Sequence, residues 1–145
     1  MKNLTWQNPG QLFVAQELIK IVKLKCCGIK AFEVGIAINY PGSSIENDFG
    51  WAPMHPVVEA YKSYQQMPYD RPTWDLTSVL YSVEGPSYFN VSPAGKINVT
   101  DQGATEFTPD AAGNRYYLTV DSIQAENIKQ HFVQLLTKQP AHFNK

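Results

Sequence analysis

The sequence has few cysteines, few charges and no long apolar run. Its two cysteines, Cys26 and Cys27, are neighbours, and adjacent cysteines rarely reach disulfide geometry, so we expect two reduced, buried thiols. No uncharged stretch reaches the roughly 18–20 apolar residues that a transmembrane helix needs, and the N-terminal residues lack the apolar segment of a signal peptide. These absences argue against a disulfide framework and a membrane protein, and they predict a cytoplasmic location by default.

Charge is also scarce. Charged residues make up 17% of the 145 residues, against about 25% in a typical soluble domain. Twelve basic and thirteen acidic side chains leave a net charge of −1, and the only arginines are Arg71 and Arg115. Binding of nucleic acid through phosphate neutralisation is therefore not expected. A chain with so few charges is predicted to have much of its surface covered.

Apolar residues recur at helical spacing in five parts of the chain. The predicted helices cover residues 9–28, 43–49, 56–67, 74–84 and 122–140. Their expected N-caps are Asn8, Ser43 or Ser44, Thr73, and Asp121 or Ser122. The side chains expected to be buried in the last three helices are Val57, Ala60, Tyr61 and Tyr64; Trp74, Leu76, Val79, Leu80 and Val83; and Ile123, Ile128, Phe132 and Leu135 or Leu136.

One short apolar run, Ala31 to Ile38, is bounded by turn signals. A run of this kind predicts a strand buried on both faces, as in a parallel sheet covered by helices. Glu33 does not fit such a strand, because a buried carboxylate must be paired or must leave from the strand's end.

Residues 88–120 have a different sequence pattern. Short segments of β-branched and aromatic residues are separated there by Gly95, Gly103 and Gly113, which predicts an antiparallel β-appendage. The chain thus has helices that could cover a parallel sheet but only one strand to form it. We therefore expect an α/β fold in which residues 1–145 form a single partial domain, with the β-appendage at 88–120 inside it.

Few polar side chains in the sequence are candidates for catalysis or ligand binding. No zinc-ligand spacing, phosphate-binding glycine loop or glycine-flanked serine is present. His55 precedes Pro56 and suits a local capping or loop role better than catalysis, and His131 and His142 are expected on the solvated surface. The candidates to be weighed are Glu33, Asp48, His55, Asp70, Arg71, Asp75, Glu84, His131 and His142.

Residues 69–77 stand out among these candidates. Asp75 is predicted in the first turn of a helix, beside the indole of Trp74. One interpretation makes Asp75 a partner of the helix dipole and Trp74 a core anchor. The other makes Asp75 a carboxylate for a hard cation or for ligand hydroxyls, with Trp74 as an aromatic wall. Since Ca²⁺ takes six to eight oxygen ligands, Asp75 alone could not complete such a site.

Several motifs in the sequence follow one another in a recognisable order, and the long segment from Pro68 to Tyr81 is the most specific of them. They are Phe32-Glu33-Val34-Gly35, Tyr40-Pro41-Gly42, His55-Pro56-Val57-Val58-Glu59-Ala60-Tyr61, Pro68-Tyr69-Asp70-Arg71-Pro72-Thr73-Trp74-Asp75-Leu76-Thr77-Ser78-Val79-Leu80-Tyr81, Tyr88-Phe89, Ser92-Pro93-x-Gly95, Phe107-Thr108-Pro109-Asp110 and Arg115-Tyr116-Tyr117-Leu118. Together they resemble the C-terminal half of a nucleoside hydrolase of the inosine–uridine-preferring superfamily, most of all its bacterial hydrolase-like branch. The resemblance covers roughly residues 30–120.

The resemblance implies hydrolysis of the N-glycosidic bond of ribonucleosides on an open, mainly parallel sheet covered by helices. In that family a Ca²⁺ ion holds the ribose hydroxyls and the attacking water. Asp75 matches a metal ligand contributed by the C-terminal half. Trp74 stands where many members have a histidine general acid, and it is expected to line the nucleoside pocket. Glu33 is a second, weaker candidate for substrate binding.

The family's N-terminal Asp-x-Asp…Asp-Asp motif, which supplies most of the Ca²⁺ ligands, is not found in this sequence. The resemblance therefore predicts a C-terminal half that is inactive alone and that a separately encoded N-terminal half could complement; such a half could also carry a signal peptide. Two alternatives are a non-catalytic remnant that folds around a partner and a carbohydrate-binding module. A homo-oligomer is a further possibility, since the family commonly forms oligomers. In the carbohydrate-binding alternative, the aromatic side chains that bind the sugar would be those of Tyr88, Phe89, Phe107, Tyr116 and Tyr117.

Overall fold

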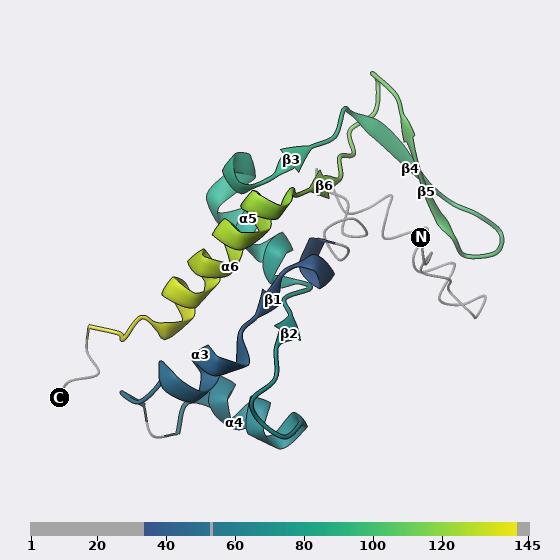
Figure 1. The fold of residues 1–145 in the computed structure, drawn as a ribbon. Coiled ribbons are helices and arrows are strands. Elements are labelled where there is room, and N and C mark those ends of the chain that lie inside the picture. Colours follow the sequence, from purple (N-terminus) through teal and green to yellow (C-terminus); the bar gives the residue numbers. More distant parts are fainter. Residues whose placement is uncertain (1–33, 53, 142–145) are drawn as a thin grey trace. The chain divides into compact units, whose positions relative to one another are not determined.

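The computed structural model describes residues 34–52 and 54–141 (Figure 1). The predicted first helix, the two cysteines, Glu33 and His142 lie outside the described residues. The described chain divides into two compact units. The larger unit contains residues 34–88 and 120–141, and the smaller unit contains residues 89–119.

The larger unit is mostly helical, with one short antiparallel ladder. Asn39 lies opposite Pro72 in this ladder, and Tyr40 lies opposite Arg71. Residues 34–37 are also helical. The remaining elements, in chain order, are β1 (Asn39–Tyr40), α3 (Gly42–Asn47), α4 (Pro56–Tyr64), β2 (Arg71–Pro72), α5 (Leu76–Glu84), the 3₁₀ helix η1 (Gly85–Tyr88) and α6 (Ser122–Thr137).

The smaller unit is built from antiparallel strands, as the glycine-punctuated pattern predicted. Its strands are β3 (Asn90–Val91), β4 (Gly95–Val99), β5 (Thr105–Pro109) and β6 (Leu118–Thr119). β4 and β5 form a hairpin in which Gly95 lies opposite Pro109, and β3 pairs with β6. Thr100 closes the hairpin turn, because its amide donates to the Ala104 carbonyl at 2.8 Å. Gly103 supplies the positive φ of 78° that the turn requires.

The prediction of a buried strand at residues 31–38 was wrong for the part that the structure describes. The amide of Ile38 donates to the Val34 carbonyl at 3.2 Å, as in a helix. Val34 and Ile38 are buried, whereas Ile36 is 48% exposed, so burial follows helical spacing and is confined to one face. A short apolar run cannot by itself distinguish a buried strand from a buried helix. Among the described residues every strand pair is antiparallel, and the fold is mixed α/β with small antiparallel sheets.

Helix α6 confirms most of what its sequence predicted. Asp121 is the N-cap, and it forms a capping box with Gln124. Ile128 and Phe132 are buried, and α6 packs against β1 and η1. Ile123 was expected in the core but is 72% exposed. Of the two alternatives Leu135 and Leu136, Leu135 is 50% exposed and Leu136 is half-buried. Helical periodicity defines a stripe, and here only the middle of that stripe is covered.

Helices α3 to α5 differ from the expectations at several positions. α3 has Pro41 at its N-cap and α5 has Asp75, so neither Ser43 nor Ser44 nor Thr73 is a cap. The apolar side chains of α4 reach no more than partial burial. In α5, Thr77 and Leu80 are buried. The expected core residues that are instead exposed are Tyr64, Leu76, Val79 and Val83.

Among the described residues, no helix combines the length and the apolar character needed to cross a membrane.

A polar cluster joins α5, η1 and α6. His131 was expected to be solvated, but its side chain is 21% exposed and its Nε2 lies 2.8 Å from Oε1 of Glu84. The ring of Tyr88 stacks on the His131 ring with centroids 5.0 Å apart. The hydrogen bond with His131, followed by that with Tyr88, holds the pKa of Glu84 below its ordinary value of 4.5.

This cluster predicts acid sensitivity of the larger unit. Because the pKa of Glu84 is lower in the folded protein, ionised Glu84 stabilises the fold above pH 4.5, and this contribution is lost as the pH falls through the lowered pKa. Glu84→Gln is expected to flatten the fall in stability below pH 4.5, measured by urea unfolding at a series of pH values. Glu46→Gln, a change at an exposed position of α3, is the control and should leave the acid limb unchanged. Equal acid limbs for Glu84→Gln and the parent protein would contradict the assignment.

Candidate functional site

The β1–β2 ladder brings the segment that contains Gly35 into contact with the segment that contains Thr73 and Trp74. The Thr73 amide donates to the carbonyl oxygens of both Gly35, at 2.9 Å, and Ile38, at 3.0 Å. Gly35 packs directly on the backbone of Trp74, since a Cβ at Gly35 would lie 2.3 Å from the Trp74 Cα. The motif around Gly35 therefore supports the segment that presents Trp74 and Asp75.

A second junction lies at the other end of the ladder. The amide of Gly42 donates to Oδ1 of Asp70 at 3.0 Å. A Cβ at Gly42 would lie 2.3 Å from the carbonyl oxygen of Tyr69, so the two chains approach each other as closely as a glycine permits. Asp70, a candidate for chemistry in the sequence, here holds the start of α3.

Trp74 has an unusual backbone conformation. Its φ is 32°, in the left-handed region that bulky residues rarely adopt. The turn is stabilised by the Thr77 hydroxyl, which donates to the Trp74 carbonyl at 2.8 Å, and by the Leu76 amide, which donates to the Thr73 carbonyl at 2.8 Å. Strained backbone of this kind is concentrated at functional sites, and the surrounding structure must hold it in place.

The strained turn places Asp75 at the N-cap of α5. Asp75 is exposed and its side chain makes no capping hydrogen bond. Within residues 34–52 and 54–141, no ion pair or hydrogen bond to its carboxylate is found. Its backbone carbonyl accepts from the Val79 amide at 3.1 Å. The carboxylate is therefore free, within this part of the chain, to meet a ligand.

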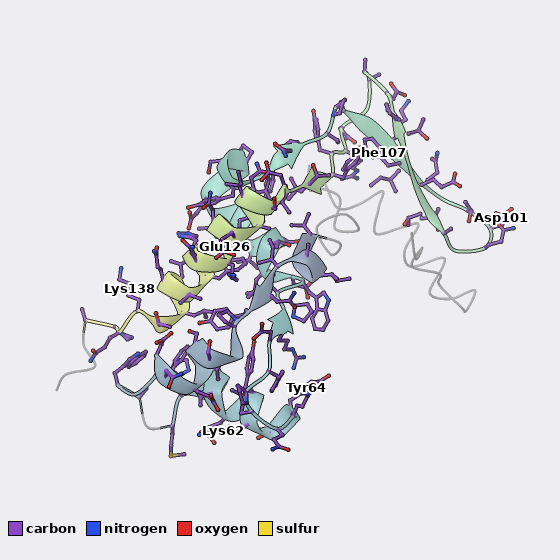
Figure 2. All side chains as sticks on the ribbon, in the orientation of Figure 1. Lys62, Tyr64, Asp101, Phe107, Glu126 and Lys138 are labelled. Atoms are coloured by element: carbon purple, nitrogen blue, oxygen red, sulfur yellow. The ribbon has the colours of Figure 1, made fainter. Side chains whose placement is uncertain are left out.

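Aromatic rings and one arginine surround the same segment. We call Tyr61, Tyr64, Tyr69, Arg71 and Trp74 the aromatic–arginine cluster. The Tyr61 and Tyr69 rings stack at 5.2 Å, and the Tyr69 hydroxyl donates to the Tyr61 carbonyl at 2.9 Å. Burial raises the pKa of Tyr61. The Arg71 guanidinium carbon lies 4.1 Å from the centre of the Tyr64 ring and 5.5 Å from that of Trp74. Tyr64, labelled in Figure 2, is 66% exposed.

His55 lies in a different aromatic environment. Its ring is 4.6 Å from that of Phe49 and 5.4 Å from that of Trp51. Its side chain does not cap α4, although its carbonyl accepts from the Glu59 amide. Its Nδ1 is buried with no hydrogen-bond partner among the described residues. His55 is therefore the N-cap residue of α4, as the expected local role implied, but it caps through its backbone while its ring packs among aromatic side chains.

A cavity of about 500 Å³ lies elsewhere in the larger unit, between residues 37–41, Asp70 and the first turns of α6. Its charged groups are already engaged. Asp121 belongs to the capping box, Lys129 pairs with Glu126, and Asp70 accepts from Gly42. The cavity offers space, but its charged side chains are committed to the fold.

The expected Ca²⁺ site is not complete within the described residues. No group of three or more His, Cys, Asp or Glu side chains in this part of the chain could hold a metal ion. Asp75 provides one carboxylate, whereas Ca²⁺ requires six to eight oxygen ligands. The described residues by themselves therefore do not fit this ion.

Sequence reasoning singled out Trp74, Asp75 and Arg71 but assigned Tyr64 to a buried stripe. The aromatic–arginine cluster could have been suspected from the sequence, because the tyrosines at positions 61, 64 and 69 lie close to Arg71 in the chain.

Comparison with known proteins gives no match: no family model, no curated protein and no solved structure matches this chain.

Proposed function

We propose that this chain is the C-terminal part of a nucleoside N-ribohydrolase-like protein. The proposal rests on one observation above the others, together with the resemblance of the motifs. Gly35 and Trp74 pack backbone to backbone, and the resulting turn carries an exposed carboxylate on Asp75, the residue that follows Trp74 in the chain. This is the arrangement that a ribonucleoside requires, since hydroxyl groups need acceptors and a base needs an aromatic wall.

The proposed site needs carboxylates from outside the described residues. Asp75 provides acceptor oxygens for a cation or for ribose hydroxyls, and Trp74 provides the wall. We propose that an N-terminal half with the Asp-x-Asp…Asp-Asp motif supplies the remaining ligands. That half would also add the open, mainly parallel sheet that the resemblance implies. A non-catalytic remnant that binds a partner is the alternative.

The carbohydrate-binding alternative is less well supported. Phe89 is 6% exposed, and the rings of Phe107 and Tyr117 pack edge to face at 4.9 Å. Tyr88 stacks on His131. These aromatic side chains pack against protein groups and do not form an open sugar-binding platform.

A complementation assay tests the proposed function. The purified chain is mixed with the N-terminal half of a nucleoside hydrolase and assayed with inosine, uridine and a chromogenic riboside, with Ca²⁺ or with a chelator. We expect no turnover by the chain alone and Ca²⁺-dependent turnover by the mixture. Asp75→Asn should lower turnover by about 100-fold or more, because even residues that only orient a metal ligand cost about 10–100-fold when they are replaced.

Asp101→Asn, an equivalent change at an exposed position of the β4–β5 turn, is the matched control and should leave turnover unchanged. Turnover in the mixture that is equal for Asp75→Asn and Asp101→Asn would reject Asp75 as a site residue. No turnover in any mixture would favour the non-catalytic alternative. Turnover by the chain alone that is lost in Asp75→Asn would place a complete site within this chain.

A further inference from the structure

The guanidinium of Arg71 is held by aromatic rings rather than by a carboxylate. It belongs to β2, where the ladder fixes the backbone opposite Tyr40. The Tyr64 and Trp74 rings lie within 5.5 Å of its central carbon. In the part of the chain that the structure describes, no ion pair or hydrogen bond to this guanidinium is found. The adjacent carboxylate, Asp70, accepts from the amide of Gly42 instead.

Contacts of this kind leave the binding capacity of an arginine unused. A guanidinium above a ring interacts through its face, whereas its five N–H donors point outward in its own plane. Those donors form a rigid fork that matches the oxygens of a phosphate. The two rings fix the orientation of the fork, so less side-chain freedom is lost when an anion binds.

The surroundings of Arg71 indicate what else the anion would carry. Tyr64 is 66% exposed although it contacts Arg71 and its ring lies 6.2 Å from that of Tyr69, so part of the Tyr64 side chain remains accessible to a planar group. A net charge of −1 and only two arginines in the chain argue against a polyanion. A single phosphate joined to an aromatic base satisfies both the fork and the ring.

We propose that Arg71, with the rings of Tyr64 and Trp74, binds the phosphate of a nucleoside monophosphate, and that the exposed Tyr64 ring stacks on its base. The site requires no metal ion and no hydrolysis. It shares Trp74 with the function proposed above, but it is tested by binding without turnover, so each proposal can fail without the other.

Titration calorimetry in the presence of a chelator tests this site on the full chain. The probes are uridine 5′-monophosphate, ribose 5-phosphate, inorganic phosphate and uridine. We expect uridine 5′-monophosphate to bind most tightly, the two other phosphates more weakly, and uridine most weakly of all. Arg71→Lys keeps the charge but loses the planar fork, and it should weaken binding of the monophosphate by about 10-fold.

Two further variants complete the test. Arg115→Lys makes the same change at the only other arginine and should leave the affinity unchanged. Tyr64→Ala removes an exposed ring and should weaken the monophosphate about 10-fold while ribose 5-phosphate changes less, because base stacking on an aromatic ring contributes to binding. The proposal is overturned if the monophosphate binds no better than uridine, or if Arg71→Lys and Arg115→Lys behave alike. If Arg71→Lys does not fold, an equal loss of both phosphorylated probes, or no loss, in Tyr64→Ala rejects the stacking.

Discussion

Replacing Gly35 by alanine is expected to lower the free energy of unfolding of the larger unit by about 3 kcal/mol, the upper part of the usual range for overpacking. The added Cβ would lie 2.3 Å from the Trp74 Cα and 2.5 Å from its amide nitrogen and carbonyl oxygen. These are backbone atoms, which cannot move aside as the end of a flexible side chain can. Urea unfolding followed by circular dichroism measures the effect.

The chain offers a matched control for this substitution. Nothing lies within 4 Å of the position that a Cβ would take at Gly50. Gly50→Ala should therefore change the stability by no more than about 0.5 kcal/mol. If the two alanine variants unfold at the same urea concentration, the close approach of Gly35 to Trp74 is not present in solution.

Ile128→Ala is expected to have a comparably large effect. Ile128 is fully buried in α6, and truncating a buried isoleucine to alanine costs about 2–5 kcal/mol through lost burial and the cavity left behind. Ile123→Ala is the same change on the same helix at a side chain that is 72% exposed. We expect that control to stay within about 0.5 kcal/mol of the parent protein.

Thermal and urea unfolding of both variants distinguish the two positions. A loss of stability in Ile123→Ala as large as in Ile128→Ala would show that α6 buries its whole predicted stripe, as the sequence alone suggested. The expected difference is large enough to be resolved with either method.

Features that depend on local chemistry could be predicted from the sequence. The N-cap of α6 is an example, because Asp121 and Gln124 satisfy each other's backbone amides within a single turn. The antiparallel strands of residues 88–120 are another, since glycines at the turns and β-branched residues between them act over short distances. In both cases no distant residue is needed to select the conformation.

Features that depend on distant partners could not be predicted. The helical conformation of residues 34–37 is selected by packing, because the same apolar run fits either secondary structure. Trp74, whose φ is positive, packs against Gly35 where a Cβ would not fit, and this contact joins residues too far apart in the chain for a local rule. Tyr64 is exposed because the other described elements leave most of its side of α4 uncovered. Helical periodicity places a residue on one side of a helix, but it does not show whether that side is covered.

The candidate site was predicted in its residues more than in its structure. Trp74 and Asp75 were singled out by their motif, and the structure explains how a strained turn presents them. The stacking of Arg71 on Tyr64 joins β2 to α4. Glu33 lies outside the described residues, so its role in substrate binding stays a prediction.

The hydrogen bonds of Thr73 also bear on how the chain folds while it is being made. The Thr73 hydroxyl and amide meet the Gly35 carbonyl across 38 residues, which a ribosome adding about 5–20 residues per second takes several seconds to synthesise. Residues 34–40 therefore wait for β2 before they gain these partners. Residues 34–40 gain their contacts with α6 later still, because α6 packs on β1 but follows residues 89–119 in the chain. The β-strands of that intervening stretch can pair during the delay, so among the described residues the larger unit is completed last.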